Sequence, residues 1–237
     1  MALGSDRIIV SNDARVQEQF DAGLRAHMLR VYNYMASGLA LTGIVAYYVA
    51  ASGLYLQMAQ SGLIWLFILA PLGFVFFFSF KIQTMKASTA QAIFWLFAAC
   101  MGVSLASIFL VYTNASIARV FFITAGTFAG MSLYGYTTSK DLSGWGSFLM
   151  MGLIGIILAS IVNIFVGSSA LQFAVSVIGV IIFVGLTAYD TQRIKLEYSE
   201  NYDQATSSKL AIMGALRLYL DFINLFIMLM SLLGNRR

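Results

Sequence analysis

Long apolar runs, separated by short polar connections, make up most of this 237-residue chain. Seven of the runs are close to the length of about 20 residues that an α-helix needs to cross the hydrocarbon core of a bilayer. Short connections between consecutive runs favour neighbouring antiparallel helices. The pattern therefore predicts an all-α, polytopic integral membrane protein, a bundle of seven transmembrane helices. The predicted spans are residues 30–51, 62–80, 90–111, 117–137, 145–166, 171–189 and 210–233.

The N-terminal segment differs from the rest of the chain because it is largely polar. Apolar residues recur there at every fourth position, while charged residues occupy another face; the apolar residues are Val16, Phe20, Leu24 and Met28. This spacing predicts an amphipathic helix, and its place before the first span favours a position at the membrane interface. We therefore divide the chain into a cytoplasmic N-terminal segment, residues 1–29, and a seven-helix transmembrane domain, residues 30–237.

The composition excludes water as the main solvent of this chain. Hydrophobic residues make up 60% of it and charged residues 10%, against roughly 25% charged in soluble domains. A transmembrane barrel would alternate apolar and polar residues over short strands, which this sequence does not do. The net charge of +4 does not indicate nucleic-acid binding, because the basic residues flank the apolar runs. With one cysteine and one histidine, the sequence predicts no intrachain disulfide, no histidine-based metal or catalytic site and no tightly bound cofactor.

The distribution of Lys and Arg predicts the orientation, since basic residues are enriched on the cytoplasmic side of membrane proteins. A cytoplasmic N-terminus places eleven basic residues on or near that side and three on the other. Seven spans then put the C-terminus on the far side, where its two arginines do not fit the rule. A last segment that re-enters the membrane and returns is the alternative. The eleven are Arg7, Arg15, Arg25, Arg30, Lys81, Lys86, Lys140, Arg193, Lys195, Lys209 and Arg217, and the other three are Arg119, Arg236 and Arg237.

Glycines within the spans indicate where helices approach one another closely. The chain has 20 glycines, and Gly126 and Gly130 form a small-xxx-small pattern in the fourth span. We expect this face to pack against a neighbouring helix.

Two acidic residues interrupt the last two apolar runs. Asp190 ends the sixth run and Asp221 lies inside the seventh. An aspartate near the middle of a membrane helix costs about 2.5–3.5 kcal/mol to insert, so it usually faces protein or water and has a function. With a cytoplasmic N-terminus, the two runs meet at the same face, which allows the acids to approach each other. Two carboxylates about 5 Å apart repel by about 3 kcal/mol at an effective dielectric of about 20, so we expect them to share a proton and titrate as a unit.

Basic and amide side chains near the two acids are candidate partners. One arginine lies about one turn from each acid, Arg217 on the seventh span and Arg193 after the sixth, and either can form a salt bridge that locks the two helices together. Asn224 follows the second acid by one turn, and Asn163 in the fifth span is a further candidate. Simpler interpretations stay open, with Asp190 as an interfacial helix cap and Arg217 as a side chain that reaches the headgroups.

Two stretches around the acids resemble the paired signature of the Bax inhibitor-1 (TMBIM) family. The order and spacing of the spans resemble that family from about residue 25 onward, and the short tails resemble those of its bacterial members. The resemblance implies a seven-helix bundle with the last helix central, in a bacterial inner (plasma) membrane. The two stretches are Ala188-Tyr189-Asp190-Thr191-Gln192 and Leu218-Tyr219-Leu220-Asp221-Phe222-Ile223-Asn224-Leu225-Phe226.

The resemblance also implies a function, a pH-sensitive calcium leak channel gated by protonation of a di-aspartyl unit. The two acids of that unit match Asp190 and Asp221 in this sequence. Family members have a basic residue near the end of the second span that pairs with the acids, and here Lys81 and Lys86 occupy that region. The predicted partners are accordingly the lipid bilayer, calcium and protons.

The predicted calcium site is weak and transient. Calcium prefers about six to eight oxygen ligands, whereas Asp190, Asp221 and Asn224 supply an incomplete cage. Weak binding suits the passage of an ion better than its storage. The direction of gating stays open, because protonation both loosens a salt-bridged lock and weakens the attraction for the ion.

Three other functions compete with this interpretation. An intramembrane aspartyl protease would use two acids to activate water, but such proteases resemble one another in a GxGD sequence where this chain has Leu218-Tyr219-Leu220-Asp221, so we expect no enzyme. A non-catalytic regulator that binds a membrane protease or cell-death or stress factors would use the N-terminal helix and the charged loop 197–209. A proton-coupled exchanger is the third alternative.

Overall fold

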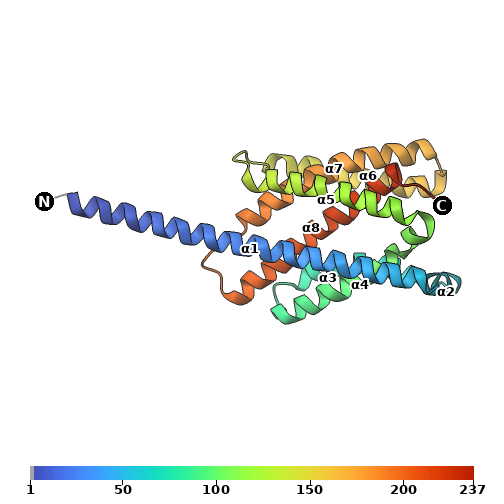
Figure 1. The fold of residues 1–237 in the computed structure, drawn as a ribbon, viewed down its shortest axis with the longest axis horizontal. Helices are drawn as coiled ribbons and strands as arrows, with labels where there is room; N and C mark the ends of the chain where they lie inside the picture. The colour runs from blue at the N-terminus through green and yellow to red at the C-terminus, as the bar shows by residue number, and fades with distance from the viewer. Residues whose placement is uncertain (1–2) are drawn as a thin grey trace.

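The computed structural model describes the backbone of residues 3–237 and the side chains from Glu18 onward. Within this range the secondary structure is helical (Figure 1). Seven helices, counting only Glu18–Ala51 of the first, are long and apolar enough to cross a membrane, which confirms the predicted all-α bundle. The helices are α1 (Leu3–Ala51), α2 (Leu54–Gln60), α3 (Ile64–Lys81), α4 (Ala87–Val111), α5 (Asn114–Thr137), α6 (Ser143–Val166), α7 (Ser169–Leu196) and α8 (Gln204–Leu233).

Helix α1 crosses the predicted domain boundary at residue 29 without a break. Leu24 and Met28, on its predicted apolar face, are buried in the core, and the ring centroid of Phe20 lies 5.5 Å from that of Tyr198. The side chain of Val16, on the same predicted face, lies outside the described side chains. This face therefore contacts the bundle from Phe20 onward, and the interfacial position of residues 1–29 stays a prediction.

The short helix α2 was not expected from the apolar pattern. It begins after Gly53 and is followed by Gly62, and both glycines have a φ of 75°, a left-handed conformation that suits a residue without a Cβ. These two turns let the chain leave α1, form α2 and enter α3 in the reverse direction.

Helix α8 lies at the centre of the bundle, as predicted. In the most hydropathic part of α8, 56% of the residues are buried, against 11% in α3 and α6. In Figure 1, α8 crosses between the group formed by α5, α6 and α7 and the group formed by α1, α3 and α4. Tyr219 of α8 is fully buried, and its hydroxyl lies 2.7 Å from Oγ1 of Thr42 on α1. The middle of α8, including Asp221, is therefore enclosed by the other helices.

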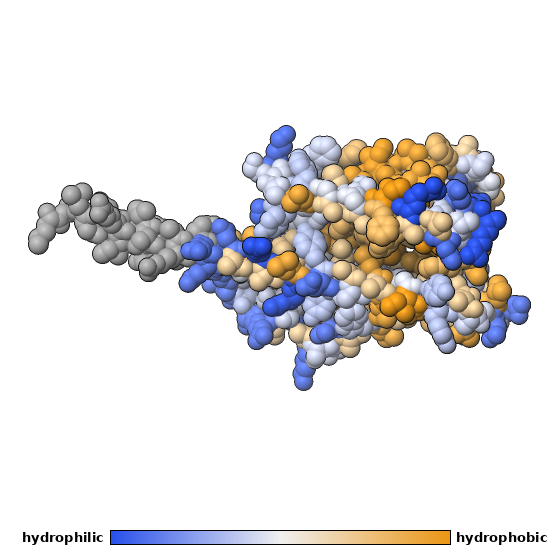
Figure 2. Space-filling model, in the orientation of Figure 1, coloured by the Kyte–Doolittle hydropathy of each residue, from blue (hydrophilic) through white to orange (hydrophobic). Residues whose placement is uncertain are grey.

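The surface has the distribution that a bilayer requires. Figure 2 shows hydrophobic residues gathered over the middle of one face, with hydrophilic residues toward both ends. Large exposed side chains on the outer helices include Phe80, Ile164 and Phe165, at 78–85% exposure. Such exposure is stable in lipid, where apolar surface needs no burial in protein.

The C-terminus lies at the end of the bundle opposite the N-terminus (Figure 1). Helix α8 runs without interruption to Leu233, so the alternative of a re-entrant last segment is wrong. The final residues instead pair with the connection between α4 and α5, where the backbone N of Arg237 donates to the carbonyl of Val111 at 2.9 Å. Arg236 and Arg237 therefore lie in an extended terminal segment at this end of the bundle, and the chain does not return to the other end.

The predicted contact through Gly126 and Gly130 is wrong. Both glycines are exposed, and a Cβ at either position would meet no atom within 4 Å. Helix α5 turns this face to the membrane and uses other positions to approach its neighbours. The small-xxx-small spacing gave no information on which face of α5 is covered.

Candidate functional site

Asp190 and Asp221 meet where the last turns of α7 pass the middle of α8. The two helices are joined by residues 197–203 and pack against each other. Asp221 is 5% exposed, and Asp190 is partly buried. Their carboxyl groups are close enough to form a side-chain hydrogen bond with each other. The structure thus brings the two predicted site residues together.

The contact between the two acids depends on a proton. A hydrogen bond between two carboxyl groups needs a proton on one of them, because an ionised carboxylate only accepts hydrogen bonds. Oδ2 of Asp221 is buried and has no hydrogen-bond partner among the described residues. A buried charge that lacks partners is unfavourable, so the ionisation of either acid depends on the state of the other. The arrangement can therefore act as a single titrating unit.

Glu197 joins two arginines beside the acids. Its two carboxylate oxygens each accept a hydrogen bond of 2.9 Å from Nη1 of Arg217, and one of them also accepts a 2.9 Å bond from Nε of Arg193. Arg217 lies within electrostatic reach of both acids as well. The two predicted arginines therefore adjoin the pair, but both form their salt bridge with Glu197. We call Asp190, Asp221, Arg217 and Glu197 the acid seam.

Two glycines allow neighbouring helices to approach the acid seam closely. A Cβ at Gly135 of α5 would collide with the backbone of Ala188 of α7, and a Cβ at Gly146 of α6 would collide with the ring of Tyr189. Ala188 and Tyr189 directly precede Asp190 in α7. These contacts fix α7 against α5 and α6 next to the acid, in the manner of close small-residue contacts between membrane helices.

A chain of hydroxyl groups connects α1 to the same part of α7. The hydroxyl of Tyr32 lies 2.7 Å from Oγ of Ser132 on α5, which lies 2.9 Å from Oγ1 of Thr191. Thr191 donates in turn to the carbonyl of Thr187 at 2.7 Å. Since Thr191 follows Asp190 directly, the chain of hydroxyl groups joins α1 and α5 to the turn of α7 that carries this acid.

Four other predicted partners lie outside the acid seam. Lys81 and Lys86, at the end of α3 and the start of α4, are exposed and form no salt bridge with any described residue. Asn224 donates to the carbonyl of Leu220 on its own helix at 2.8 Å. Asn163 lies near the opposite end of α6 and bonds to Gln172 and Ser168, so its predicted contact with the acids is wrong. The direction of α6 carries Asn163 away from the acids, while Asn224 lies on the same helix as Asp221 but bonds to its own backbone.

Sequence reasoning missed Glu197 beside the acids and His27, which lies within electrostatic reach of Glu197. The sequence places Glu197 only in a charged loop, although its position four residues after Arg193 is a recognisable helical salt-bridge spacing. His27 was considered only as a lone residue, yet it is 5% exposed and its ring centroid lies 5.5 Å from that of Tyr198. No pattern in the sequence links α1 to the connection after α7, so this second contact was not predictable.

The described residues contain no group of three or more His, Cys, Asp or Glu side chains that could hold a metal ion. Asp190 and Asp221 therefore have no third ligand of these types placed to share a metal ion with them among the described residues. A tight calcium site of about six to eight oxygens needs more ligands than this pair supplies.

Comparison with known proteins supplies the family. A family model described as "Inhibitor of apoptosis-promoting Bax1" matches residues 24–237, which includes nearly all of the seven candidate spans. The chain belongs to the Bax inhibitor-1 family. The predicted resemblance is thereby confirmed, and it extends to both helices that carry the acids.

Several bacterial relatives of this Bax inhibitor-1 family chain are similar over almost their whole length. The inner membrane protein YbhL of Escherichia coli is 50% identical over 230 residues, which cover 95% of this chain and 97% of the relative. An uncharacterized protein of Rickettsia prowazekii is 51% identical over 219 residues, covering 92% and 93%. Another, of Caulobacter vibrioides, is 47% identical over 234 residues, covering 94% of each. None of these relatives carries the name of an enzyme, and the chain is an integral membrane protein like the first.

Proposed function

We propose that this Bax inhibitor-1 family protein is a pH-sensitive calcium leak channel, gated by protonation of the Asp190 and Asp221 pair. The observation that carries the proposal is the contact of the two carboxyl groups on α7 and α8, inside the most buried helix pair of a membrane bundle. Charged residues at such a depth are rare in membrane proteins and mark ion or proton pathways.

The state of the proton determines what the pair can do. With one proton, the carboxyl groups hold α7 and α8 together by a hydrogen bond. With none, the two carboxylates repel each other, by about 4 kcal/mol for unit charges about 4 Å apart at an effective dielectric of about 20, and the same charges attract a divalent cation. Protonation therefore sets both how tightly the two helices associate and how strongly the seam attracts calcium.

The ligand set favours passage over storage. Two carboxylates leave most of the coordination shell of calcium to water and to backbone carbonyls, so the ion binds weakly and leaves readily. Asp190 is only partly buried, which gives the pair contact with the surroundings that Asp221 lacks. Asp190 and Asp221 are accordingly the residues to which we assign both proton sensing and transient calcium contact.

The orientation follows from the charges at the two ends. The end that carries the acid seam also carries Lys81, Lys86 and Lys140, whereas Arg119, Arg236 and Arg237 lie at the other. By the positive-inside rule the seam faces the cytoplasm, with the N-terminus on the same side. The name of the Escherichia coli relative supports the inner membrane as the location.

Calcium flux into proteoliposomes tests the proposal. The protein is reconstituted with a calcium dye inside the vesicles, and flux is recorded from about pH 6 to about pH 8, where a coupled carboxyl pair can titrate. Wild type should show a flux that changes with pH, and Asp190→Asn and Asp221→Asn should each remove that change. Asp141→Asn is the matched control, because Asp141 is exposed in the connection between α5 and α6. A wild type without calcium flux, or single variants with wild-type pH dependence, would overturn the proposal.

A further inference from the structure

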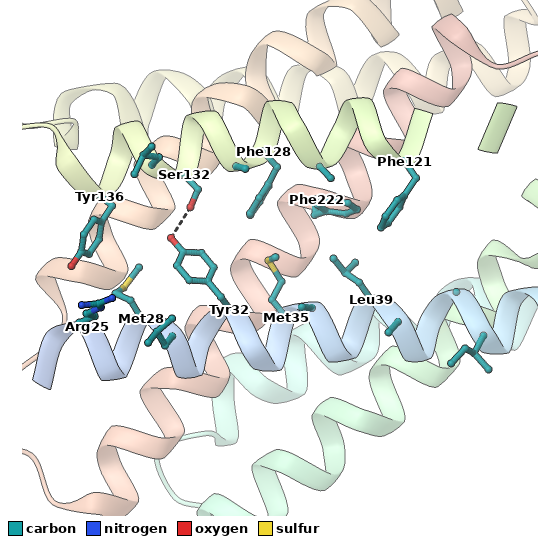
Figure 3. Close-up of a pocket in the computed structure, with 18 residues that line it drawn as sticks. Arg25, Met28, Tyr32, Met35, Leu39, Phe121, Phe128, Ser132, Tyr136 and Phe222 are labelled. Carbon is teal, nitrogen blue, oxygen red and sulfur yellow. Dashed lines mark hydrogen bonds between the residues drawn. The ribbon is translucent and has the colours of Figure 1, made fainter. Parts of the chain in front are cut away.

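A large groove runs between α1 and α5, away from the acid seam. It has a volume of about 1040 Å³, and Phe222 of α8 forms part of its floor (Figure 3). The two helices stand apart along the groove, and the hydrogen bond between Tyr32 and Ser132 bridges them. Small side chains leave the space open, among them Ala36 and Ala40 of α1. We call this feature the α1–α5 groove.

The α1–α5 groove opens to the hydrocarbon region of the membrane. Its walls belong to two candidate spans, Glu18–Ala51 and Asn114–Thr137. Large apolar side chains on its rim are exposed, including Leu29 at 53% and Leu133 at 63%. A hollow with apolar walls at this depth excludes polar solutes, so its natural occupant is a hydrocarbon chain.

One end of the groove is polar and positively charged. Figure 3 shows Arg25 and Tyr136 at the same end, with the phenol oxygen of Tyr136 on the side of Arg25. Lys195 lies beside them, with Nζ 5.3 Å from the centroid of the Tyr136 ring and 2.9 Å from the Tyr136 carbonyl. None of the described residues that line the groove is acidic. The charge at this end complements a phosphate, and Arg25 and Tyr136 supply the hydrogen-bond donors.

The length of the apolar part matches one leaflet of a bilayer. From Met28 to Leu39, α1 rises about 16 Å at about 1.5 Å per residue. Half of a hydrocarbon core of about 30 Å is about 15 Å. A lipid whose phosphate lies at Arg25 therefore places its acyl chain along the apolar walls, with the chain end near Phe121.

We propose that the α1–α5 groove is a binding site for one anionic phospholipid, held by its phosphate at Arg25 and Tyr136 and by an acyl chain between α1 and α5. The bound lipid touches Tyr32 and Ser132, the first two members of the hydroxyl chain that ends at Thr191 beside Asp190. Lipid binding at this site does not depend on the proposed calcium transport, because none of the residues that line the groove belongs to the acid seam.

Native mass spectrometry of the full-length protein in mild detergent tests this site. Dioleoyl phosphatidylglycerol and dioleoyl phosphatidylcholine are added separately at equal concentrations, and the masses of retained lipid are counted. Wild type should retain one phosphatidylglycerol in preference to phosphatidylcholine. Arg25→Ala should weaken phosphatidylglycerol binding about fivefold, the effect of losing one basic residue at a membrane surface, and leave phosphatidylcholine unchanged.

Two further variants separate the apolar part of the site from its charge. Ala36→Phe fills the groove and should reduce retention of both lipids, whereas Ser37→Phe, on an exposed neighbouring position outside the groove, should not. Arg30→Ala is the charge control, because Arg30 is exposed on α1 and does not line the groove. Equal retention of the two lipids by wild type would overturn the proposal. Lipid retention that neither Arg25→Ala nor Ala36→Phe changes would also overturn it. A dimer that carries no lipid and buries this groove between its two subunits would do the same.

Discussion

The acid seam and the α1–α5 groove lie in the same bundle but differ in how their helices approach each other. At the seam, glycines let α5 and α6 pack closely against α7, and Glu197 forms a salt bridge with Arg217 beside the two aspartates. At the groove, α1 and α5 stand apart, and the space between them is lined by apolar and small side chains. The difference indicates that this protein encloses its buried acids where helices pack tightly, and the open, apolar space between α1 and α5 is the feature on which we base the proposed lipid site.

The two regions are also connected, because Tyr32 and Ser132 line the groove while Thr191 belongs to the helix that carries Asp190. A substitution that disturbs helix packing at the acid seam can be compared with a substitution that removes only its salt bridges. Thermal unfolding of both variants then reports whether packing or polar bonding holds the acids in place.

The largest effect is expected from Gly135→Ala, which forces α5 away from α7 beside the acid seam. The added methyl collides with the backbone of Ala188, and overpacking of this kind costs about 1–3 kcal/mol or more. The variant should unfold at a lower temperature than wild type when helicity is followed by circular dichroism in detergent. Gly130→Ala is the control, since its methyl enters open space and should leave the unfolding temperature unchanged or raise it. Equal losses in both variants would contradict the tight contact.

A smaller effect is expected from Glu197→Gln, which tests the polar side of the seam. The change removes the salt bridges to Arg217 and Arg193, whose partly exposed positions limit the loss in free energy of unfolding to about 1 kcal/mol. Raising the salt concentration should shrink the difference from wild type, because these charges are accessible to ions. Glu200→Gln, an exposed acid in the same connection, should have no effect on the unfolding temperature. A salt-independent loss for Glu197→Gln would mean that packing, rather than charge, links the two helices.

The smallest effect is expected at Asp203, which begins α8 outside both regions. Its carboxylate accepts a hydrogen bond of 3.3 Å from the backbone N of Thr206, and hydrogen bonding from Thr206 holds the pKa of Asp203 below its usual value. A lowered pKa in the folded state stabilises the protein above the unfolded pKa of about 3.9, and the contribution is lost as the pH falls through the folded value. Asp203→Asn keeps the cap and should lose this acid sensitivity in unfolding curves recorded below about pH 5. Curves that follow wild type at every pH would contradict it.

The seven spans and the pairing of Asp190 with Asp221 were predictable from the sequence, because length and hydropathy define membrane helices and a buried acid needs a partner. The salt-bridge partner of Arg217 was not predictable from the sequence. Arg217 lies one turn from Asp221, yet its guanidinium bonds to Glu197, because the connection after α7 folds back beside α8. Which side chain an arginine reaches depends on helix rotation, which the apolar pattern does not encode.

The α1–α5 groove was equally beyond prediction from the sequence. Ala36, Ala40 and Ala129 have the small side chains that often bring membrane helices together, and here they line a gap instead. Gly126 and Gly130 show the same ambiguity, since a Cβ at either position would meet no atom within 4 Å. Small residues permit close packing, but the contacts of the other helices decide whether it occurs.

Calcium flux in a double-mutant cycle tests the central proposal, that Asp190 and Asp221 act as one proton-sensing unit. Wild type, Asp190→Asn, Asp221→Asn and the double variant are compared in the same proteoliposome assay at about pH 6 and about pH 8. If the pair is one unit, each single variant loses the difference in flux between the two pH values, and the double variant behaves like either single one. Additive effects of the two substitutions, or a double variant that still responds to pH as wild type does, would contradict the account.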